Sequence, residues 1–338
     1  MSVLVTGAGG FLGGALVERL LVRGEKDVRC FMRTQTNRSA LEALAQKHPG
    51  ARVQFITGNL MSPSDIETAL KGVDTVYHLA AGMSGAPADL FLNTVVASKN
   101  LLEAAKDLKS LRIVLVSSFG VYGVADLPRG SVLDERTALE PHPEKRDPYS
   151  YAKLRQELLF REYQSRYGFE LVVLRPGVVY GPGGGAFSAR VGLALGPLFL
   201  HLGGGNKIPL TFVENCADAI VVAGQSPKAA GEAFNVHDDD LPTSRQYLKA
   251  YKRDVRPVRS LRIPYWLMQL ISRAVARYHV YSRGQMPAVF TPYKTATLWK
   301  GTRFSNEKLK AIGWQPLVPT QEGLRRTFEY ARNHQSVR

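Results

Sequence analysis

The first strand-like run of the sequence ends in a glycine-rich turn that leads directly into a helical pattern. Residues 3–6 read Val-Leu-Val-Thr, and residues 7–13 read Gly-Ala-Gly-Gly-Phe-Leu-Gly. Gly7 permits a tight turn, Gly10 lets the backbone approach a bound pyrophosphate, and Gly13 allows the helix to sit against the strand. The turn therefore predicts a dinucleotide site in a strand–turn–helix unit of an α/β fold.

The same alternation of strands and helices continues to about residue 176. The predicted strands span residues 3–6, 28–32, 53–57, 75–78, 113–117 and 171–174, and the predicted helices span residues 11–21, 39–46, 63–70, 88–106 and 148–167. Strands that alternate with helices of this length predict βαβ units and a parallel sheet covered on both faces.

We therefore predict an α/β fold with a doubly wound parallel Rossmann sheet of about seven strands. Residues 1–176 form the NAD(P)-binding domain in this prediction. Residues 177–338, where glycine clusters break the alternation, form mainly a small mixed α/β C-terminal lobe that receives the substrate, with some segments returning to the sheet.

The excess of positive charge is confined to the last part of the chain. The 338 residues hold 44 Lys and Arg against 29 Asp and Glu, a formal charge of +15. Residues 1–240 hold 25 of each kind, whereas residues 241–338 hold 19 basic and 4 acidic residues. This distribution excludes a uniformly basic nucleic-acid-binding protein, so we expect no nucleic-acid partner.

Cysteine content and hydropathy bear on the compartment. Cys30 and Cys216 lie in segments that we expect to be packed, which predicts two buried thiols and a reducing environment. The apolar start has no basic region before it, and no uninterrupted apolar run reaches about 18 residues. We therefore expect a cytoplasmic protein.

Four motifs, in order along the chain, resemble those of one enzyme family. They are TGAGGFLG at residues 6–13, Gly58-Asn59-Leu60, His78-Leu79-Ala80-Ala81, and RPGVVYGP at residues 175–182. They are similar to the glycine turn and the GDL, HLAA and RPxxVYGP segments of the extended short-chain dehydrogenase/reductases, also called the NAD-dependent epimerase/dehydratase family. The resemblance covers nearly the whole chain. It implies that the cofactor is contacted by Gly7, Gly10, Phe11, Leu12, Gly13, Asn59, Leu60, Leu79, Ala80, Ala81 and Pro176.

The end of the second predicted strand carries the choice between NAD and NADP. NAD enzymes usually place a carboxylate here to accept hydrogen bonds from the ribose 2′-hydroxyl. This chain has Met32 at that position, followed by Arg33. A cation there favours a 2′-phosphate, with Arg38 as a second contact, so we predict NADP as the preferred cofactor and NAD as the alternative. The competing interpretation is that Arg33 is a solvated loop residue.

Tyr149 and Lys153 are four residues apart in a helical segment and therefore share one face. A phenol is a poor base at neutral pH, but a neighbouring ammonium stabilises the phenolate, so the tyrosine can exchange a proton with a substrate alcohol or carbonyl. The resemblance implies that Ser118 would hydrogen-bond the substrate oxygen. It also implies that Tyr149 and Lys153 contact the cofactor, with Lys153 holding the nicotinamide ribose. We predict Ser118, Tyr149 and Lys153 as the catalytic residues.

A metal site is not expected. The run His237-Asp238-Asp239-Asp240 is better explained as a loop after a strand-like segment, because four consecutive side chains rarely converge on one ion. No Cys/His spacing typical of zinc sites occurs in the sequence.

The resemblance also separates two classes of small-molecule substrate. Nucleotide-sugar enzymes of the family commonly carry Asn in RxxNVYGP and Arg shortly before a VxD segment, and both serve the nucleotide diphosphate. This chain has Val178 at the first position and no arginine in residues 207–212, although Lys207 or Arg190 would be substitutes.

Other segments favour a different branch of the family. Residues 213–219, 291–294 and 304–309 resemble the 3β-hydroxysteroid dehydrogenase-like and dihydroflavonol reductase-like branches. We therefore predict hydride transfer to or from a secondary alcohol or ketone, often on an apolar skeleton. A nucleotide-sugar epimerase/dehydratase and a non-enzymatic NADP-sensing regulatory or scaffold protein remain the alternatives.

Residues 264–278 combine a helical apolar stripe with arginines and a tryptophan. The stripe falls on residues 267, 270, 271, 274, 275 and 278. Such a helix can lie on an anionic membrane surface as a peripheral contact, close over an apolar substrate, or pack on the body of the protein. A homodimer also stays open, since dimers are common in the resembled family.

Overall fold

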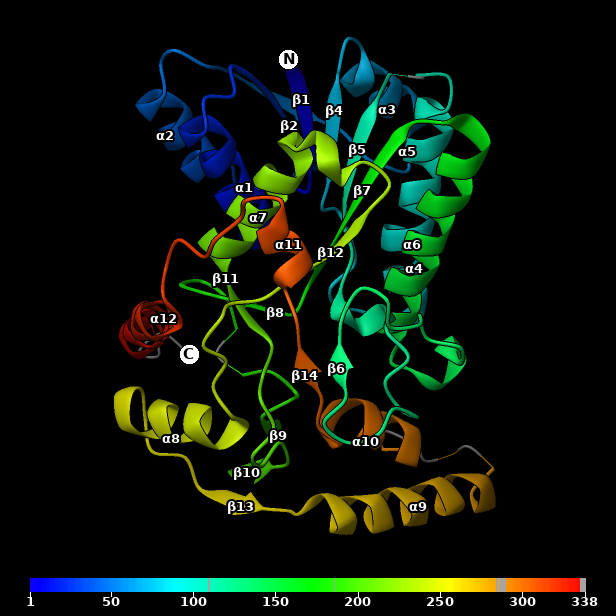
Figure 1. Cartoon of the computed structure of the whole chain (residues 1–338), viewed down its shortest axis with the longest axis vertical. Helices are drawn as coiled ribbons and strands as arrows, with labels where there is room; N and C mark the ends of the chain where they lie inside the picture. The colour runs from blue at the N-terminus through cyan, green and yellow to red at the C-terminus, as the bar shows by residue number, and fades with distance from the viewer. Residues whose placement is uncertain (109, 186, 284, 286–289, 335–338) are drawn as a thin grey trace.

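Seven parallel strands form one central sheet in the computed structural model, which describes residues 1–334 apart from 109, 186, 284 and 286–289. The strand order is β12-β7-β5-β4-β1-β2-β3, and every neighbouring pair is parallel (Figure 1). The strands are β1 (Ser2–Thr6), β2 (Asp27–Met32), β3 (Arg52–Thr57), β4 (Thr75–His78), β5 (Arg112–Val116), β7 (Glu170–Pro176) and β12 (Ala233–Val236). The predicted Rossmann sheet of about seven strands is confirmed.

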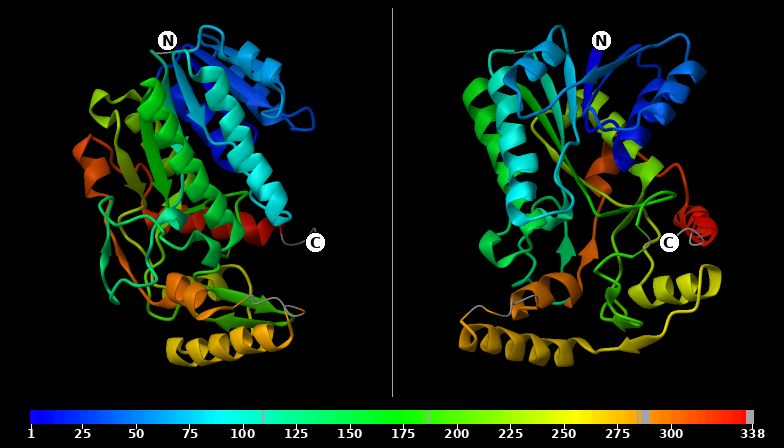
Figure 2. Two further views of the ribbon diagram at one scale, coloured as in Figure 1. Left: turned by 90° about the vertical axis from the view of Figure 1, so that its right-hand side faces the viewer. Right: turned by 180° about the vertical axis from the view of Figure 1, so that it is seen from behind.

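Helices cover both faces of this sheet (Figures 1 and 2). Successive side chains of a strand point to opposite faces, so Val3 and Val5 of β1 pack in one core and Leu4 packs in the other. The first core is closed by α1 (Phe11–Val22), α2 (Ser39–Lys47) and α7 (Val213–Gln225), and the second by α3 (Pro63–Leu70), α5 (Ala97–Ala105) and α6 (Pro148–Tyr167).

The strand order reverses direction at β1. β2 and β3 lie on one side of β1, and β4 and β5 lie on the other. In open parallel sheets, ligands bind in the crevice outside the carboxyl ends of the strands at such a switch point. The glycine turn follows β1, so the predicted dinucleotide motif stands at the edge of the sheet where a ligand is expected.

The carboxyl edge of the sheet faces a second lobe (Figure 1). Its small sheets pair β9 with β10 and β13, β8 with β11, and β6 with β14. The remaining strands are β6 (Val132–Leu133), β8 (Val178–Tyr180), β9 (Gly192–Leu195), β10 (Leu198–His201), β11 (Leu210–Phe212), β13 (Ser260–Arg262) and β14 (Arg303–Phe304). The remaining helices are α4 (Pro87–Phe91), α8 (Ser244–Asp254), α9 (Tyr265–Tyr281), α10 (Pro292–Trp299), α11 (Glu307–Ala311) and α12 (Thr320–His334). Although α7 and β12 follow residue 176, both lie in the Rossmann layers.

The helix predicted at residues 88–106 is interrupted in the structure. α4 ends at Phe91, and a π-helical turn, Leu92–Val96, precedes α5. Thr94 lies in this turn, and its hydroxyl accepts a hydrogen bond at 2.9 Å from the N–H of Gly82, in the loop after β4. The irregular turn thus ties the helix to the carboxyl edge of the sheet, a typical location for π-bulges.

The predicted apolar stripe of α9 is not the face that packs on the protein. The buried residues of α9 are Met268 and Ser272, and the Ser272 hydroxyl hydrogen-bonds Thr295 of α10 at 2.6 Å. Leu270 and Tyr278, both in the predicted stripe, are exposed. The face of α9 that packs on the protein thus includes the polar contact between Ser272 and Thr295, which hydrophobic periodicity does not reveal. Among the described residues, none of the helices has the length and apolar character that crossing a bilayer requires.

Candidate active site

The turn after β1 contains two positions that only glycine fits. Gly7 has a φ of +73°, in the left-handed region, and a Cβ there would lie 3.1 Å from the backbone nitrogen of Ala80. A Cβ at Gly13 would lie 2.1 Å from the carbonyl oxygen of Gly7. The two glycines therefore allow α1 to start tightly against β1 and the loop after β4.

The N-terminus of α1 lies exposed at the carboxyl edge of the sheet. Gly10 is the N-cap residue and has no side chain to cap the helix, and Gly10 and Phe11 are exposed. Unpaired amide groups and the positive end of the helix dipole make such a terminus suitable for a phosphate. The Phe11 ring lies beside the loop after β8, since a Cβ at Gly184 would be 2.9 Å from Phe11 Cζ. Leu12 instead packs against the core.

Arg33 stands directly after β2, beside the glycine turn. Its carbonyl oxygen accepts a hydrogen bond at 3.0 Å from the N–H of Thr36, and a Cβ at Gly9 would lie 2.1 Å from Thr36 Cγ2. The Arg33 side chain is exposed and makes no ion pair with any described residue. Arg38, the predicted second phosphate contact, is instead paired with Glu42 at 2.8 Å on the surface of α2.

The loops after β3 and β4 bring the other predicted cofactor residues to the same edge. The Asn59 side-chain oxygen accepts the Met61 N–H at 3.0 Å, which leaves the exposed Asn59 in a local turn. The carbonyl of Leu60 accepts a hydrogen bond at 2.9 Å from Asn100 of α5. These hydrogen bonds fix the loop. The side-chain oxygen of Asn59 already accepts one of them.

Thr6 at the end of β1 holds the loop after β4. The N–H of Leu79 donates to the Thr6 carbonyl and the N–H of Ala80 to the Thr6 hydroxyl, both at 3.3 Å. Ala80 and Ala81 are half-buried at the crevice, whereas Pro176 is buried at the end of β7. The motif residues that are scattered along the sequence thus lie along one edge of the sheet.

Ser118 and Tyr149 lie close enough for the serine to influence the pKa of the tyrosine. Ser118 follows β5 and caps a short helical turn by accepting the N–H of Gly120 at 3.1 Å. Tyr149 lies in the first turn of α6, whose N-cap, Asp147, accepts the N–H of Ser150 at 2.9 Å. Burial raises the pKa of the Tyr149 phenol, the hydrogen bond with Ser118 lowers it in part, and the Asp147 carboxylate raises it further. The phenol is therefore held in its protonated form.

Lys153 lies on the same helix, one turn after Tyr149, and is buried. Its ammonium donates to the carbonyl of Val116 and to the side-chain oxygen of Gln156, each at 2.6 Å. Burial lowers the pKa of Lys153 to about 7, and the nearby Glu157 carboxylate opposes this shift. A lysine whose pKa lies near neutrality can change its charge during a reaction near that pH.

The sequence reasoning missed a buried polar chain behind Lys153. The Gln156 amide donates to Ser98 at 2.8 Å, and His78 contacts Ser98 at 2.9 Å and the Thr6 hydroxyl at 2.8 Å. Burial, with a contribution from Lys153, lowers the pKa of His78 to about 3. The chain connects Lys153 to the strand that carries the glycine turn. The one sequence feature that pointed to this chain was Gln156, a polar residue three positions after Lys153 and on the same side of the helix.

A second buried cluster that the sequence did not predict lies between α6 and β7. Glu157 is paired with Arg175 and accepts a hydrogen bond at 2.7 Å from Ser117. Arg175 also donates to the hydroxyl of Tyr122 at 2.9 Å. Burial would raise the pKa of the Glu157 carboxyl, but the hydrogen bond and charge of Arg175 hold it below its usual value. The arginine of the RPGVVYGP motif is thus a structural partner of α6, the helix that carries Tyr149 and Lys153.

Arg190, in the loop before β9, carries a positive charge without an acidic partner in the described part of the chain. Its guanidinium lies over the Phe304 ring, 5.9 Å from the centroid, and it has no acidic partner among the described residues. Burial lowers the pKa of Arg190 to about 10, and the positive charge of Arg146 adds to the shift. Phe304 stacks on Phe119, the residue after Ser118, with 5.6 Å between ring centroids. The rings of Phe304 and Phe119 therefore lie between the unpaired guanidinium and Ser118, the predicted catalytic serine.

Arg146 differs from Arg190 because its charge is compensated. It forms an ion pair with Glu140 at 2.9 Å and lies 3.4 Å from the hydroxyl of Ser150, next to Tyr149. Tyr293 of α10 also donates to Glu140. These contacts attach the second lobe to the start of α6, and they leave Arg190, unlike Arg146, without an acidic partner among the described residues.

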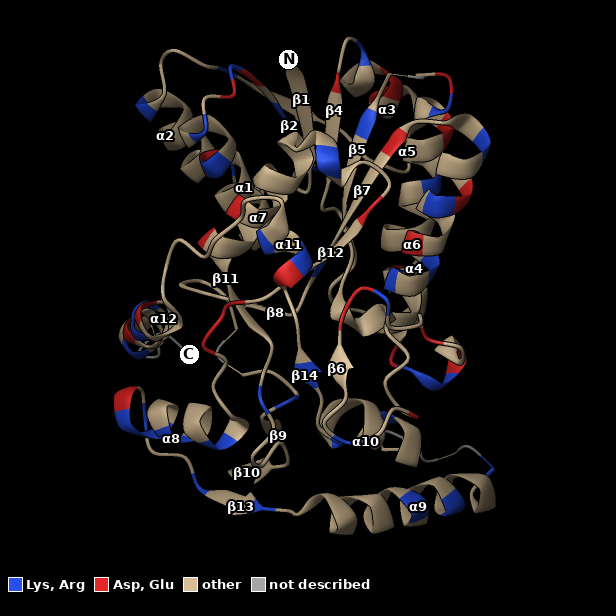
Figure 3. Ribbon diagram, in the orientation of Figure 1, with Lys and Arg blue, Asp and Glu red and all other residues tan. Residues whose placement is uncertain are grey.

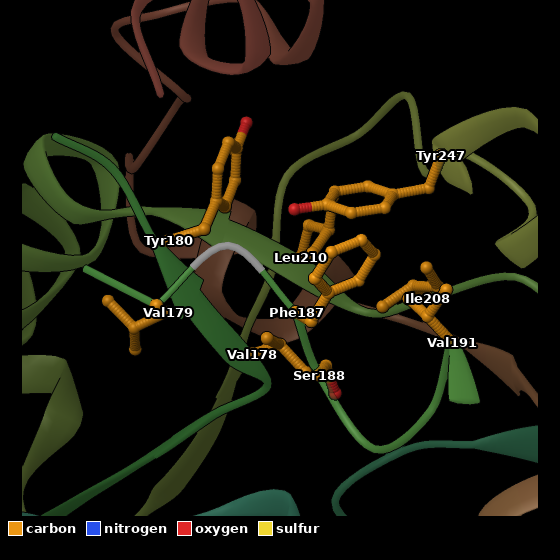
Figure 4. Close-up of a pocket in the computed structure, with 10 residues that line it drawn as sticks. Val178, Val179, Tyr180, Phe187, Ser188, Val191, Ile208, Leu210 and Tyr247 are labelled. Carbon is orange, nitrogen blue, oxygen red and sulfur yellow. The ribbon is translucent and has the colours of Figure 1, made fainter. Parts of the chain in front are cut away.

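A small apolar cavity lies in the second lobe, close to Arg190 in the chain (Figure 4). Its volume is about 170 Å³, and no catalytic candidate lines it. The cavity is lined by Val178, Val179, Tyr180, Gly185, Phe187, Ser188, Val191, Ile208, Leu210 and Tyr247. Figure 4 shows side chains from the β8 segment, the loop before β9 and the β11 segment gathered around the same space.

The residues at the predicted loop 237–240 do not gather around an ion. His237 contacts the rings of Phe119 and Phe304, and Asp238 accepts hydrogen bonds from Asn215 and Tyr180. In the part of the chain that the structure describes, no group of three or more His, Cys, Asp or Glu side chains is placed to hold a metal ion.

Known proteins resemble this chain over most of its length. UDP-glucose 4-epimerase of Vibrio cholerae is 27% identical over 97% of this chain and 94% of its own. Sterol-4-alpha-carboxylate 3-dehydrogenase, decarboxylating, of Homo sapiens is 27% identical over 99% of this chain and 89% of its own. Among solved structures, UDP-glucuronic acid 4-epimerase from Bacillus cereus in complex with NAD superposes with a TM-score of 0.73, at 21% identity, over 99% of this chain and 98% of that one.

The family itself follows from a match to its sequence profile. The profile of the NAD dependent epimerase/dehydratase family matches residues 3–236, which include the glycine turn, Ser118, Tyr149 and Lys153. The relatives are epimerases and dehydrogenases, so the alternative of a non-enzymatic scaffold is set aside. The chain belongs to the NAD-dependent epimerase/dehydratase family and is an enzyme of the extended short-chain dehydrogenase/reductase class.

Proposed function

We propose that the protein is an NADP-preferring oxidoreductase that moves a hydride between the nicotinamide and a secondary alcohol or ketone. Tyr149 is the acid and base, Ser118 orients the substrate oxygen, and Lys153 gives electrostatic support. The observation that carries the proposal is the placement of Ser118 beside Tyr149 at the carboxyl edge of β5, with Lys153 one helical turn along α6. This group stands at the edge where dinucleotides bind in sheets of this order.

The residues after β1 fit a dinucleotide. Side chains at Gly7 and Gly13 would fill the turn, and the open N-terminus of α1 at Gly10 suits a pyrophosphate. When bound, NADP supplies the hydride or accepts it at nicotinamide C4. The free guanidinium of Arg33 beside this turn suits the 2′-phosphate, whereas Arg38 is engaged by Glu42.

The protonation states of the site favour reduction of a carbonyl at neutral pH. The raised pKa of Tyr149 keeps its proton on the phenol, so Tyr149 can donate it to the substrate oxygen as the carbonyl carbon gains a hydride. The Ser118 hydroxyl would hydrogen-bond the same oxygen. The charged form of Lys153 stabilises the phenolate that this proton transfer leaves.

The apolar cavity supports a substrate with an apolar skeleton. Val178 stands where nucleotide-sugar enzymes of the family carry the asparagine for the diphosphate, and Ile208 lies in the segment where they carry the arginine. Both side chains line the cavity, so groups that would bind a diphosphate are replaced by apolar surface. At about 170 Å³ the cavity is smaller than the ~300–1,000 Å³ of typical ligand pockets. It would take an alkyl chain or one ring of a larger substrate.

Arg190 favours a substrate that also carries an anionic group. A partly buried guanidinium with no acidic partner gains stability when an anion binds it. A carboxylate beside the reacting carbon is one such group, and the name of the human relative describes a carboxylated substrate. A nucleotide diphosphate is another, and Arg190 is therefore the observation that keeps a nucleotide-sugar epimerase, like the Vibrio cholerae relative, as the second candidate.

Thermal stability of the NADPH complex separates the two candidates. A ligand that binds only the native state raises its melting temperature. We expect 3-oxodecanoate, which has an alkyl chain and a carboxylate one methylene away from a ketone, to raise the melting temperature, and UDP to leave it unchanged. A rise with UDP and none with 3-oxodecanoate would favour the nucleotide-sugar reaction instead.

The chemical role of Tyr149 is tested by comparing two tyrosines of one helix. Tyr149→Phe removes the proposed proton donor, so we expect ketone-dependent NADPH oxidation to fall by roughly 10²–10⁴-fold with cofactor binding retained. Tyr151→Phe is the matched control, because Tyr151 is two residues away, and it should keep turnover near the wild-type rate. Undiminished turnover in Tyr149→Phe would refute the proposed mechanism.

A further inference from the structure

The outer face of α9 exposes large apolar side chains together with arginines. Trp266, Leu270 and Tyr278 are 64%, 50% and 53% exposed, and Tyr281 at the end of the helix is 84% exposed. Spacings of four, eight and three residues place these side chains along one side of a helix. Monomeric proteins rarely leave such apolar patches open, and a patch of this kind usually marks a contact surface.

The inner face of the same helix is already occupied. Met268 packs in a cluster with Leu202 and Trp299, and Gln269 and Ser272 hydrogen-bond α10 through Pro292 and Thr295. These contacts fix the rotation of α9 on the lobe. The exposed side chains therefore cannot turn inward without breaking them.

The helix also lies at an extremity of the molecule. In Figures 1 and 2, α9 runs along the edge of the second lobe that is farthest from the Rossmann sheet, and no described helix or strand covers its outer side. β13, which precedes α9, lies along the same edge with Leu261 and Arg262 exposed. The edge can therefore approach an extended surface without obstruction from the rest of the protein.

The charge of this segment has a single sign. Residues 255–306 contain nine Lys and Arg and no Asp or Glu. Arg273 and Arg277 of α9 are exposed among the apolar residues and have no acidic partner in the described part of the chain (Figure 3). An uncompensated positive surface calls for a negative partner.

The combination of residues selects among the possible partners. In a symmetric dimer through this face, the arginines of one copy would lie against those of the other, which opposes self-association. A lipid surface meets both requirements, since amphipathic helices with basic residues and exposed Trp and Leu bind in the interfacial plane of anionic bilayers. Trp and Tyr are also the side chains that prefer this interface.

We propose that the α9 face, defined by Leu261, Arg262, Trp266, Leu270, Arg273, Arg277, Tyr278 and Tyr281, docks the protein on the surface of an anionic lipid bilayer. The helix lies in the plane of the headgroups. Its apolar side chains enter the boundary with the acyl chains, and its arginines contact the lipid phosphates. This contact does not depend on the reaction proposed above.

Binding of the full chain to vesicles tests the proposal. We expect co-sedimentation with vesicles that mix phosphatidylglycerol and phosphatidylcholine, little with phosphatidylcholine alone, and release in high salt. Trp299 and Trp314 are 2% and 0% exposed, so Trp266 is the tryptophan that a lipid surface can reach. Its emission should shift to the blue on binding, and Trp266→Phe should abolish the shift.

Paired substitutions locate the contact. Each basic residue near an anionic surface contributes about 1 kcal/mol, so Arg273→Gln with Arg277→Gln should weaken binding roughly 30-fold. Lys47→Gln with Lys228→Gln removes the same charge from exposed sites elsewhere and should have little effect. Equal losses in both pairs, equal binding to neutral vesicles, or absence of binding would overturn the proposal. A concentration-dependent dimer that the Arg273 and Arg277 substitutions abolish would also overturn it, in favour of a second copy of the chain.

Discussion

The charged side chains around Lys153 at the carboxyl edge of the Rossmann sheet are buried and paired, whereas those at the α9 edge of the second lobe are exposed and have no acidic partner among the described residues. At the sheet edge, Lys153, Glu157 and Arg175 are buried, and each has a hydrogen-bond or ion-pair partner. At the α9 edge, Arg273 and Arg277 are exposed without acidic partners. Burial makes partners obligatory, because an unpaired charge in a low dielectric is costly, whereas water and salt tolerate an unpaired charge at the surface. The first region is therefore built to hold its own geometry, and the second has surface available for something outside the chain.

Breaking the buried pair should give the largest effect. Arg175→Met leaves the Glu157 carboxylate buried without its arginine, so we expect the free energy of unfolding to fall by about 3–5 kcal/mol. Chemical denaturation measures this change. Lys308→Met is the control at the protein surface, because it breaks the exposed pair with Glu232 and should change stability by less than about 1 kcal/mol. Similar losses in both variants would remove the distinction between the two regions.

Acid should have the next-largest effect, by destabilising the buried polar chain that contains His78. The folded pKa of His78 is about 3, below the ordinary value of 6.5, so the unfolded chain binds a proton that the folded chain does not. The contribution of His78 to stability is present above pH 6.5 and is lost as the pH falls toward 3, at up to about 1.4 kcal/mol per pH unit. Denaturant unfolding at several pH values across this range measures the effect. The free energy of unfolding should depend less steeply on pH in His78→Gln than in the wild type. Identical slopes would mean that His78 takes up its proton in the folded state.

Activity should fall on the alkaline side at a pH set by Lys153. Its folded pKa of about 7 lies below the ordinary 10.5, so its positive charge is lost as the pH rises through neutrality. Ketone reduction needs that charge, and its rate should drop up to about tenfold per pH unit above the pKa. Gln156→Leu removes a hydrogen-bond partner of the ammonium and should move the inflection to lower pH, since less remains to stabilise the charged form. A rate that stays constant to pH 9 would show that the charge on Lys153 is not required.

Substitution of Arg33, the exposed arginine beside the glycine turn, should give the smallest effect. Arg33→Gln removes the proposed 2′-phosphate contact and should weaken NADPH binding by roughly tenfold, about 1.4 kcal/mol, with little change for NADH. Arg38→Gln is the control, because Arg38 is already paired with Glu42. Tighter binding of NADH than NADPH by the wild type would contradict the preference for NADP.

Local sequence patterns were enough to predict the Rossmann sheet. Apolar β-branched runs predict strands, and the glycines at 7, 10 and 13 predict the turn. Both structures depend on residues that are close together in the sequence. The chain from His78 through Ser98 to Gln156 could not be predicted this way, because its members come from three elements that meet only in the folded protein. The sequence left open which face of α9 packs on the protein for a similar reason, since the contact between Ser272 and Thr295 joins residues 23 positions apart.

Net consumption of NADPH is the measurement that tests the central proposal most directly. The account predicts that the wild-type protein oxidises one NADPH for each alcohol formed from 3-oxodecanoate, and that Tyr149→Phe abolishes this reaction. Interconversion of UDP-glucose and UDP-galactose without net loss of NADPH, together with no oxidation of NADPH by ketones, would contradict it.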